Sequence, residues 1–284
     1  MASQGTLAVL PNVLMPPTSV TLAVQTTPAI RPTPPTPPTT NFRLLDPLQL
    51  SVCQGPSTTP PSSCYNLKDV ATILVKDGLK RKEYTVLREL VMWHSSYFAA
   101  ALNPEGGWSQ DGEQPLTLDC AHATFDATCC WLFTGKLNDP ATDNMLIDKA
   151  YLSQRTLVST WTFADFHGIP ALGNSAIDMM HERSVAVWVL PCYVIRHVYE
   201  YTTAASKLRK YFVERYILSC PLDLMTAEPS LYTKEFLCAV LPALARDERC
   251  LDRDSLTSVD RCQWHDHSGP GGKLRLDSRK CVSL

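Results

Sequence analysis

The sequence lacks any run of about 18 consecutive apolar residues, so it predicts no transmembrane helix. It also lacks a basic residue before its apolar N-terminal stretch, which Pro11 and Pro16 interrupt, and so it predicts no signal peptide. No Asn-x-Ser/Thr glycosylation acceptor occurs, and the 11 cysteines follow no disulfide framework spacing. These absences predict a protein of the cytosol, the nucleus or both, which is neither secreted nor bound to a membrane.

The chain also lacks an excess of either charge. Lys and Arg number 26, Asp and Glu number 28, and the formal net charge is −2. A protein that contacts nucleic acid directly usually carries a basic patch or a positive net charge. The charge balance therefore predicts no direct nucleic-acid partner.

Catalytic motifs are missing as well. The stretch HERSV (181–185) lacks the second histidine of a zinc-protease helix, and SGPGGK (268–273) lacks the spacing of a phosphate-binding loop. No Gly-x-Ser-x-Gly sequence occurs, and no nucleophile, base and orienting group can be identified together. The sequence therefore predicts no catalytic residues, and we expect a protein that is not an enzyme.

What the chain does contain begins with a proline-rich segment. Residues 1–63 hold 13 of the 22 prolines and only three charged residues, Arg31, Arg43 and Asp46. The stretch RPTPPTPPTT (31–40) favours polyproline II, because proline removes backbone donors and blocks helix and sheet interiors. We expect a disordered Pro/Thr-rich tail, which is either simply solvated or a proline-motif ligand.

Hydrophobic periodicity indicates structure from about residue 64 onward. An Asp-Gly turn at 77–78 separates two strand patterns, and the pair Ser95-Ser96 divides a helical pattern in two, because serine favours helix N-caps. The pattern predicts strands over 70–76, 82–86 and 115–119, and helices from 87, over 122–137, within 144–168, from 170, over 193–202, 206–220 and 233–244. This order predicts an α+β fold.

Three motifs in this order resemble those of the BTB/POZ family. The first is Tyr84, Val86, Leu87, Arg88 and Leu90 followed by Ser95-Ser96-Tyr97-Phe98. The second is Leu116-Thr117-Leu118 with Phe125 and LFTGKL (132–137), and the third is FADFHGIPAL (163–172). The family pattern has histidine at the position of Leu87 and proline at the position of Ser96.

The resemblance implies a BTB/POZ fold over 64–182, with a short three-stranded sheet, a helical hairpin and stacked helices. Residues 183–245 are similar to the α-helical extension of standalone fungal BTB proteins, on the strength of 195–216. Residues 246–284 are polar and are expected to be loosely ordered.

The implied function is a protein–protein interaction module, a scaffold or adaptor without activity of its own. The alternatives are a substrate adaptor of a cullin-type ubiquitin ligase and a transcriptional regulator that does not contact DNA. The expected partners are unidentified proteins, a cullin scaffold or a second copy of this chain. Trp108 is the candidate interface anchor, and Trp108-Ser109-Gln110 is similar to the hydrophobic-x-Glu motif of cullin-binding adaptors, with Gln110 at the glutamate position.

One group of residues suggests a cofactor. Cys262, His265 and His267 lie within six positions, with Cys281 or Cys250 as the fourth candidate. Thiolate and imidazole groups are zinc ligands, and two histidines two positions apart lie on one side of an extended segment. The sequence therefore offers a zinc site at Cys262, His265, His267 and Cys281, and the alternative is a solvated tail.

Overall fold

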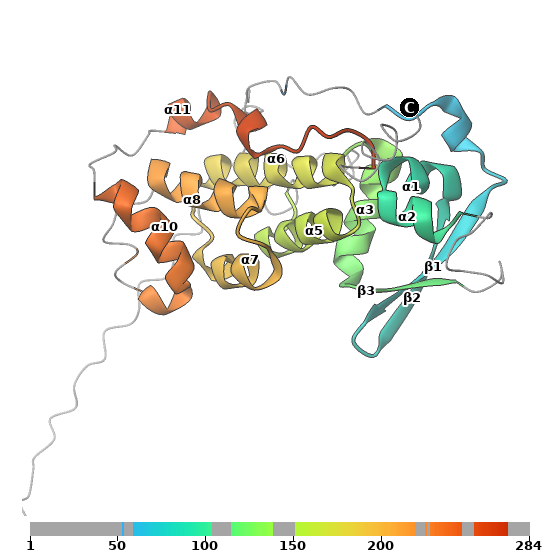
Figure 1. The fold of residues 1–284 in the computed structure, drawn as a ribbon, viewed down its shortest axis with the longest axis horizontal. Helices are drawn as coiled ribbons and strands as arrows, with labels where there is room; N and C mark the ends of the chain where they lie inside the picture. The colour runs from blue at the N-terminus through green and yellow to red at the C-terminus, as the bar shows by residue number, and fades with distance from the viewer. Residues whose placement is uncertain are drawn as a thin grey trace, which may run out of the picture. The chain divides into compact units, whose positions relative to one another are not determined.

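The computed structural model describes residues 53, 59–103, 115–138, 151–219, 225, 228–245 and 253–271. Contacts divide the chain into residues 1–40 and 41–284, and every described residue belongs to the second unit. That unit combines a three-stranded sheet with α-helices, which confirms the α+β class (Figure 1). Most of the predicted Pro/Thr-rich tail lies outside the described residues.

The strands are β1 (Val70–Asp77), β2 (Lys80–Leu87) and β3 (Leu116–Asp119). The described α-helices are α1 (Arg88–His94), α2 (Ser96–Ala101), α3 (His122–Thr134), α5 (Gln154–Phe166), α6 (Pro170–Val187), α7 (Ile195–Tyr201), α8 (Lys207–Ser219), α10 (Lys234–Leu244) and α11 (Arg253–Thr257). Short 3-10 turns are η1 (Ser62–Tyr65), η2 (Cys192–Val194), η3 (Pro229–Leu231) and η4 (Arg261–Trp264). The predicted order of hairpin, helical hairpin, short strand and helices is confirmed.

The sheet has the order β2-β1-β3, so β1 is its central strand. β1 pairs antiparallel with β2, from Val70 opposite Leu87 to Asp77 opposite Lys80, and parallel with β3. Alternate residues of β1 are buried, as expected for a strand that turns one face to the core. Gly78 has a φ of 59°, which supports the tight turn predicted from Asp-Gly.

Ser95 separates α1 from α2, as the serine pair predicts. Its backbone is extended, and its Oγ accepts a hydrogen bond from the Phe98 N–H at 3.0 Å. The same hydroxyl donates to the carbonyl oxygen of His167 at 2.6 Å, which ties the helical hairpin to the end of α5. Phe98 is completely buried, so the second helix turns inward at this motif.

Local signals also set the ends of the central helices. Gly135, with a φ of 71°, caps α3 in the left-handed conformation that favours glycine. α6 begins with Pro170 in its first turn, where a missing N–H costs nothing. α5 and α6 pack against each other, and α3 packs against both α5 and β1 (Figure 1).

One continuous core joins the sheet region to the later helices. It runs from Ala71 in β1 through α5, α6 and α8 to Trp264 in η4. The segment expected to be loosely ordered differs from that expectation over 253–271: it lies along α6 and α8, and Trp264 is fully buried. The polar composition of the segment gave no indication of this structure, because only a few of its side chains are buried. Among the described helices, none is both long and apolar enough to cross a lipid bilayer.

Candidate metal centre

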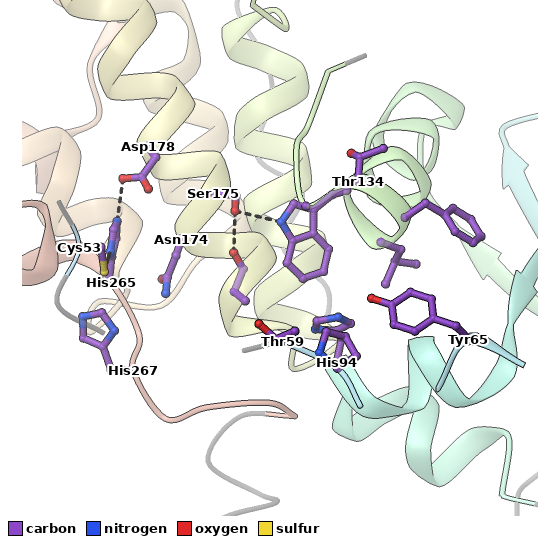
Figure 2. Close-up of a pocket in the computed structure, with 16 residues that line it drawn as sticks. Cys53, Thr59, Tyr65, His94, Thr134, Asn174, Ser175, Asp178, His265 and His267 are labelled. Carbon is purple, nitrogen blue, oxygen red and sulfur yellow. Dashed lines mark hydrogen bonds and ion pairs between the residues drawn. The ribbon is translucent and has the colours of Figure 1, made fainter. Parts of the chain in front are cut away.

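Four side chains from distant parts of the chain meet beside α6: Cys53, Cys262, His265 and His267. One donor atom from each, a thiol sulfur or an imidazole nitrogen, lies within 4.8 Å of all the others. Figure 2 shows the Cys53 sulfur next to His265, with the ring of His267 close by. This is the arrangement in which such groups can share one metal ion.

The C-terminal segment presents three of these groups through its local backbone. Asp260 caps η4, because its Oδ1 accepts a hydrogen bond from the Cys262 N–H at 2.9 Å. The chain leaves η4 in an extended conformation at His265, with φ −88° and ψ 150°. His265 and His267 therefore lie on one side, with ring centroids 5.7 Å apart, as the sequence predicts for an extended segment.

Trp264 fixes this segment on the helices. Its indole packs against His181 and Tyr211, with ring centroids 5.3 and 5.1 Å away, and its Nε1–H donates to Glu214. His181 supplies a second attachment, since its Nε2–H donates to the carbonyl oxygen of Leu256 at 3.0 Å. Burial of the ring lowers the pKa of His181 to about 4, which keeps the imidazole neutral near pH 7.

Asp178 on α6 orients His265 from the side away from the sulfur atoms. The His265 Nε2–H donates to Asp178 Oδ1 at 2.9 Å, and the Arg261 guanidinium contacts the same oxygen at 2.6 Å (Figure 2 shows the histidine bond). His265 itself is buried. A neutral imidazole that donates from Nε2 keeps the lone pair of Nδ1, and this atom faces Cys53.

The sulfur distances fit ligands of one ion better than a covalent pair. Cys53 Sγ lies 3.2 Å from His265 Nδ1 and 3.7 Å from Cys262 Sγ. A disulfide bond would require sulfur atoms about 2.05 Å apart. Two thiolates and two imidazoles form a ligand set suited to zinc.

A cavity of about 520 Å³ borders the cluster. Its wall includes Tyr65, His94 and Trp131 as well as both histidines of the cluster (Figure 2). Burial lowers the pKa of His94 to about 4, and its ring stands edge-on to Trp131 with centroids 4.8 Å apart. These contacts place His94 as a neutral packing residue of the cavity wall.

The structure thus brings together three of the four predicted zinc ligands: Cys262, His265 and His267. The fourth side chain of the cluster is Cys53, which was not among the ligands predicted from the sequence. Cys281 and Cys250 lie outside the described residues. No local pattern in the sequence pairs Cys53 with the C-terminal segment.

The predicted interaction residues Trp108 and Gln110 also lie outside the described residues. The structure instead exposes large side chains in the connection between α6 and α7: Trp188, Val189 and Tyr193 are each about half exposed. Trp188 has a φ of 52°, and among the described residues no other non-glycine has a positive φ. A bulky residue with a positive φ is a backbone outlier, and no sequence pattern predicts it.

Comparison with known proteins found no match: no family model, no curated protein and no solved structure matches the chain. The candidate site is therefore defined by the chain's own residues. Its groups come from residue 53, from α6 and from 260–267; His265 is buried, Cys53 and Cys262 are partly buried, and His267 is exposed.

Proposed function

We propose that this protein is a protein–protein interaction module of the BTB/POZ kind. The observation that carries the proposal is where the three motifs lie in the fold. The first runs from β2 through α1 into α2, the second lies on β3 and α3, and the third joins the end of α5 to the start of α6. Their apolar residues form the core that holds these elements together, including Phe98, Leu118, Phe125, Leu132, Ile169 and Leu172.

Because the motif residues pack this core, they support the proposal that the chain shares its architecture with the BTB/POZ family. Leu87, at the family's histidine position, is buried in the same core and so replaces a polar turn residue with a packing one. Ser96, at the family's proline position, keeps an N–H that donates to the Gly168 carbonyl oxygen at 3.4 Å. Both departures are compatible with the fold.

The connection between α6 and α7 is the surface we assign to partner binding. Trp188 and Tyr193 are of the residue types that dominate binding energy at interfaces. They remain about half exposed, although burial of such rings is favourable. The left-handed backbone of Trp188 is a strained conformation, and such strain is found preferentially at functional sites.

Affinity purification with chemical cross-linking tests this proposal. We expect the tagged full chain to retain protein partners whose cross-links map near residues 188–193. Replacing Trp188 and Tyr193 with alanine should weaken retention by about 30-fold, which corresponds to roughly 2 kcal/mol for an anchor. Leu79→Ala is the matched control, because Leu79 is fully exposed in the β1–β2 turn.

Two results would contradict the proposal: recovery of no partner by the wild-type chain, or unchanged recovery by the double variant. Recovery of a cullin among the partners would narrow the function to a ubiquitin-ligase adaptor.

A further inference from the structure

We propose that Cys53, Cys262, His265 and His267 bind one Zn²⁺ ion, which acts as a structural clasp between residue 53 and the C-terminal segment. This zinc site rests on the four side chains and their surroundings, independently of the proposed partner binding. Four protein ligands leave no open coordination position, and a closed site of this kind is structural rather than catalytic.

The interatomic distances fit tetrahedral coordination. Zinc binds thiolate at about 2.3 Å and imidazole at about 2.0 Å, so two sulfurs on one ion lie about 3.8 Å apart and a sulfur and a nitrogen about 3.5 Å. The observed separations are 3.7 Å for Cys53 and Cys262 and 3.2 Å for Cys53 and His265 Nδ1. These two separations are therefore close to those expected around one ion, and all four ligand atoms lie within 4.8 Å of one another.

The surroundings of His265 are those of a metal ligand. Histidine ligands usually donate their second N–H to a carboxylate, which fixes the ring and makes the ligating nitrogen more basic. Asp178 accepts this bond at 2.9 Å from the buried ring of His265. Asp178 thus acts as a positioning residue for the zinc site.

The charges also balance around such an ion. Two thiolates neutralise Zn²⁺, and the Arg261 guanidinium, 2.6 Å from Asp178 Oδ1, neutralises the carboxylate behind His265. Of this ion pair, the Arg261 side chain is only 10% exposed, and a charge held away from water in this way needs a partner. The soft sulfur donors select zinc over magnesium or calcium, which prefer oxygen.

The clasp would have a large effect on the chain because its ligands are far apart in sequence. Cys53 and Cys262 are separated by 209 positions. A link that closes a long loop removes conformational freedom from the unfolded chain, and metal binding of this kind is coupled to folding. Removal of zinc should therefore free residue 53 from the segment around His265.

The first test uses the wild-type full chain, purified under reducing conditions without a histidine tag. Elemental analysis should find one zinc per chain, and X-ray absorption at the zinc edge should show two sulfur and two nitrogen neighbours at about 2.3 and 2.0 Å. Absence of stoichiometric zinc, or a shell without sulfur, would overturn the proposal. Either result would leave the proposed interaction function unaffected.

Differential alkylation identifies the cysteine ligands without any substitution. Zinc should protect Cys53 and Cys262 from iodoacetamide, and chelation should expose both, whereas Cys281 should react equally in both states. Protection of Cys281 instead of Cys53 would show that the fourth ligand is misassigned. The variants Cys53→Ser and Cys281→Ser form a matched pair, and only the first should lower zinc affinity, by at least about tenfold.

Asp178→Asn tests the positioning role. We expect zinc affinity to fall about 10- to 100-fold while X-ray absorption still shows two sulfur and two nitrogen ligands. Asp126→Asn is the control, since Asp126 pairs with Lys82 on the surface. Unchanged affinity in Asp178→Asn would remove Asp178 from the site, and a changed ligand shell would show that it is itself a ligand.

Discussion

His265 shows how one residue can serve two parts of the structure. Its Nε2 is bonded to Asp178 on α6, and its Nδ1 faces Cys53, so the ring lies between the helix and the cluster. Neither contact follows from the sequence near His265. The sequence was enough to select Cys262, His265 and His267 as candidate ligands, because thiol and imidazole groups at short spacing can be recognised without a structure. Cys53 could not, since only the folded core brings it to them.

Phe98 gives a quantitative test at the same scale. Its side chain is completely buried between the helical hairpin and α5, with its ring stacked on His167 at a centroid distance of 5.6 Å. Phe98→Ala should lower the free energy of unfolding by roughly 3–5 kcal/mol, because it leaves a cavity. Urea denaturation measures this change.

The control for Phe98 is Phe166→Ala. Phe166 is 77% exposed, so its truncation should change stability by less than about 0.5 kcal/mol. Equal losses for the two variants would show that Phe98 is not the core residue described here.

The elements of the fold follow mostly from short-range signals. The Asp-Gly turn, the serine pair and the helix start at Pro170 are boundaries that the structure confirms, whereas the helix predicted over 122–137 ends at Thr134, where Gly135 adopts the left-handed conformation. The strand predicted at 82–86 extends over Lys80–Leu87, because antiparallel pairing with β1 continues to the turn. The packing of α11 and η4 could not be predicted, because it depends on a few buried side chains in a polar segment.

Ser95 links α2 to the end of α5. Removing its hydroxyl should therefore lower the free energy of unfolding by more than the loss of an ordinary helix cap does. Ser95→Ala removes the cap of α2 and leaves the buried carbonyl of His167 without this donor. We expect a loss of roughly 1–3 kcal/mol in the free energy of unfolding. Thermal or urea unfolding measures it.

Ser153→Ala provides the comparison for that prediction. Ser153 caps α5 through the Thr156 N–H at an exposed position, and its loss should cost about 1 kcal/mol. If Ser95→Ala costs no more than Ser153→Ala, the bond to His167 contributes nothing to stability.

At the largest scale, the described part of the chain shares one core that includes Trp264 of the segment 253–271. His181, on α6, lies near the centre of this arrangement and contacts Leu256 and Trp264, with the charged groups of Arg215, Arg261 and Asp178 nearby. The ring is fully buried. Its protonation state therefore affects how the segment 253–271 is held.

This arrangement predicts a loss of stability in mild acid. Burial lowers the pKa of His94 and of His181 to about 4, whereas the unfolded chain binds these protons near pH 6.5. As the pH falls from 6.5 to 4, the unfolded state gains protons that the folded state excludes, so the free energy of unfolding decreases. The loss should approach about 3 kcal/mol per histidine and then level off below pH 4.

Urea denaturation near pH 7.5 and near pH 4.5, in the presence of a chelator, measures this effect apart from any metal. His181→Gln should show a smaller difference between the two conditions. Carboxyl groups such as Glu182, whose pKa burial raises, act in the opposite direction and cancel in the comparison. The same pH dependence in wild type and variant would refute the assignment to His181.

The position of Trp264 also has a consequence for synthesis on the ribosome. A growing chain folds from its N-terminal parts first, yet the surface made by His181, Tyr211 and Glu214 receives its indole only after α5 to α10 have been made. Until then, a nascent chain holds an uncovered apolar face on α6 and α8. The packing of the segment 253–271 is therefore completed only after residue 264 has left the ribosome, among the last steps of folding.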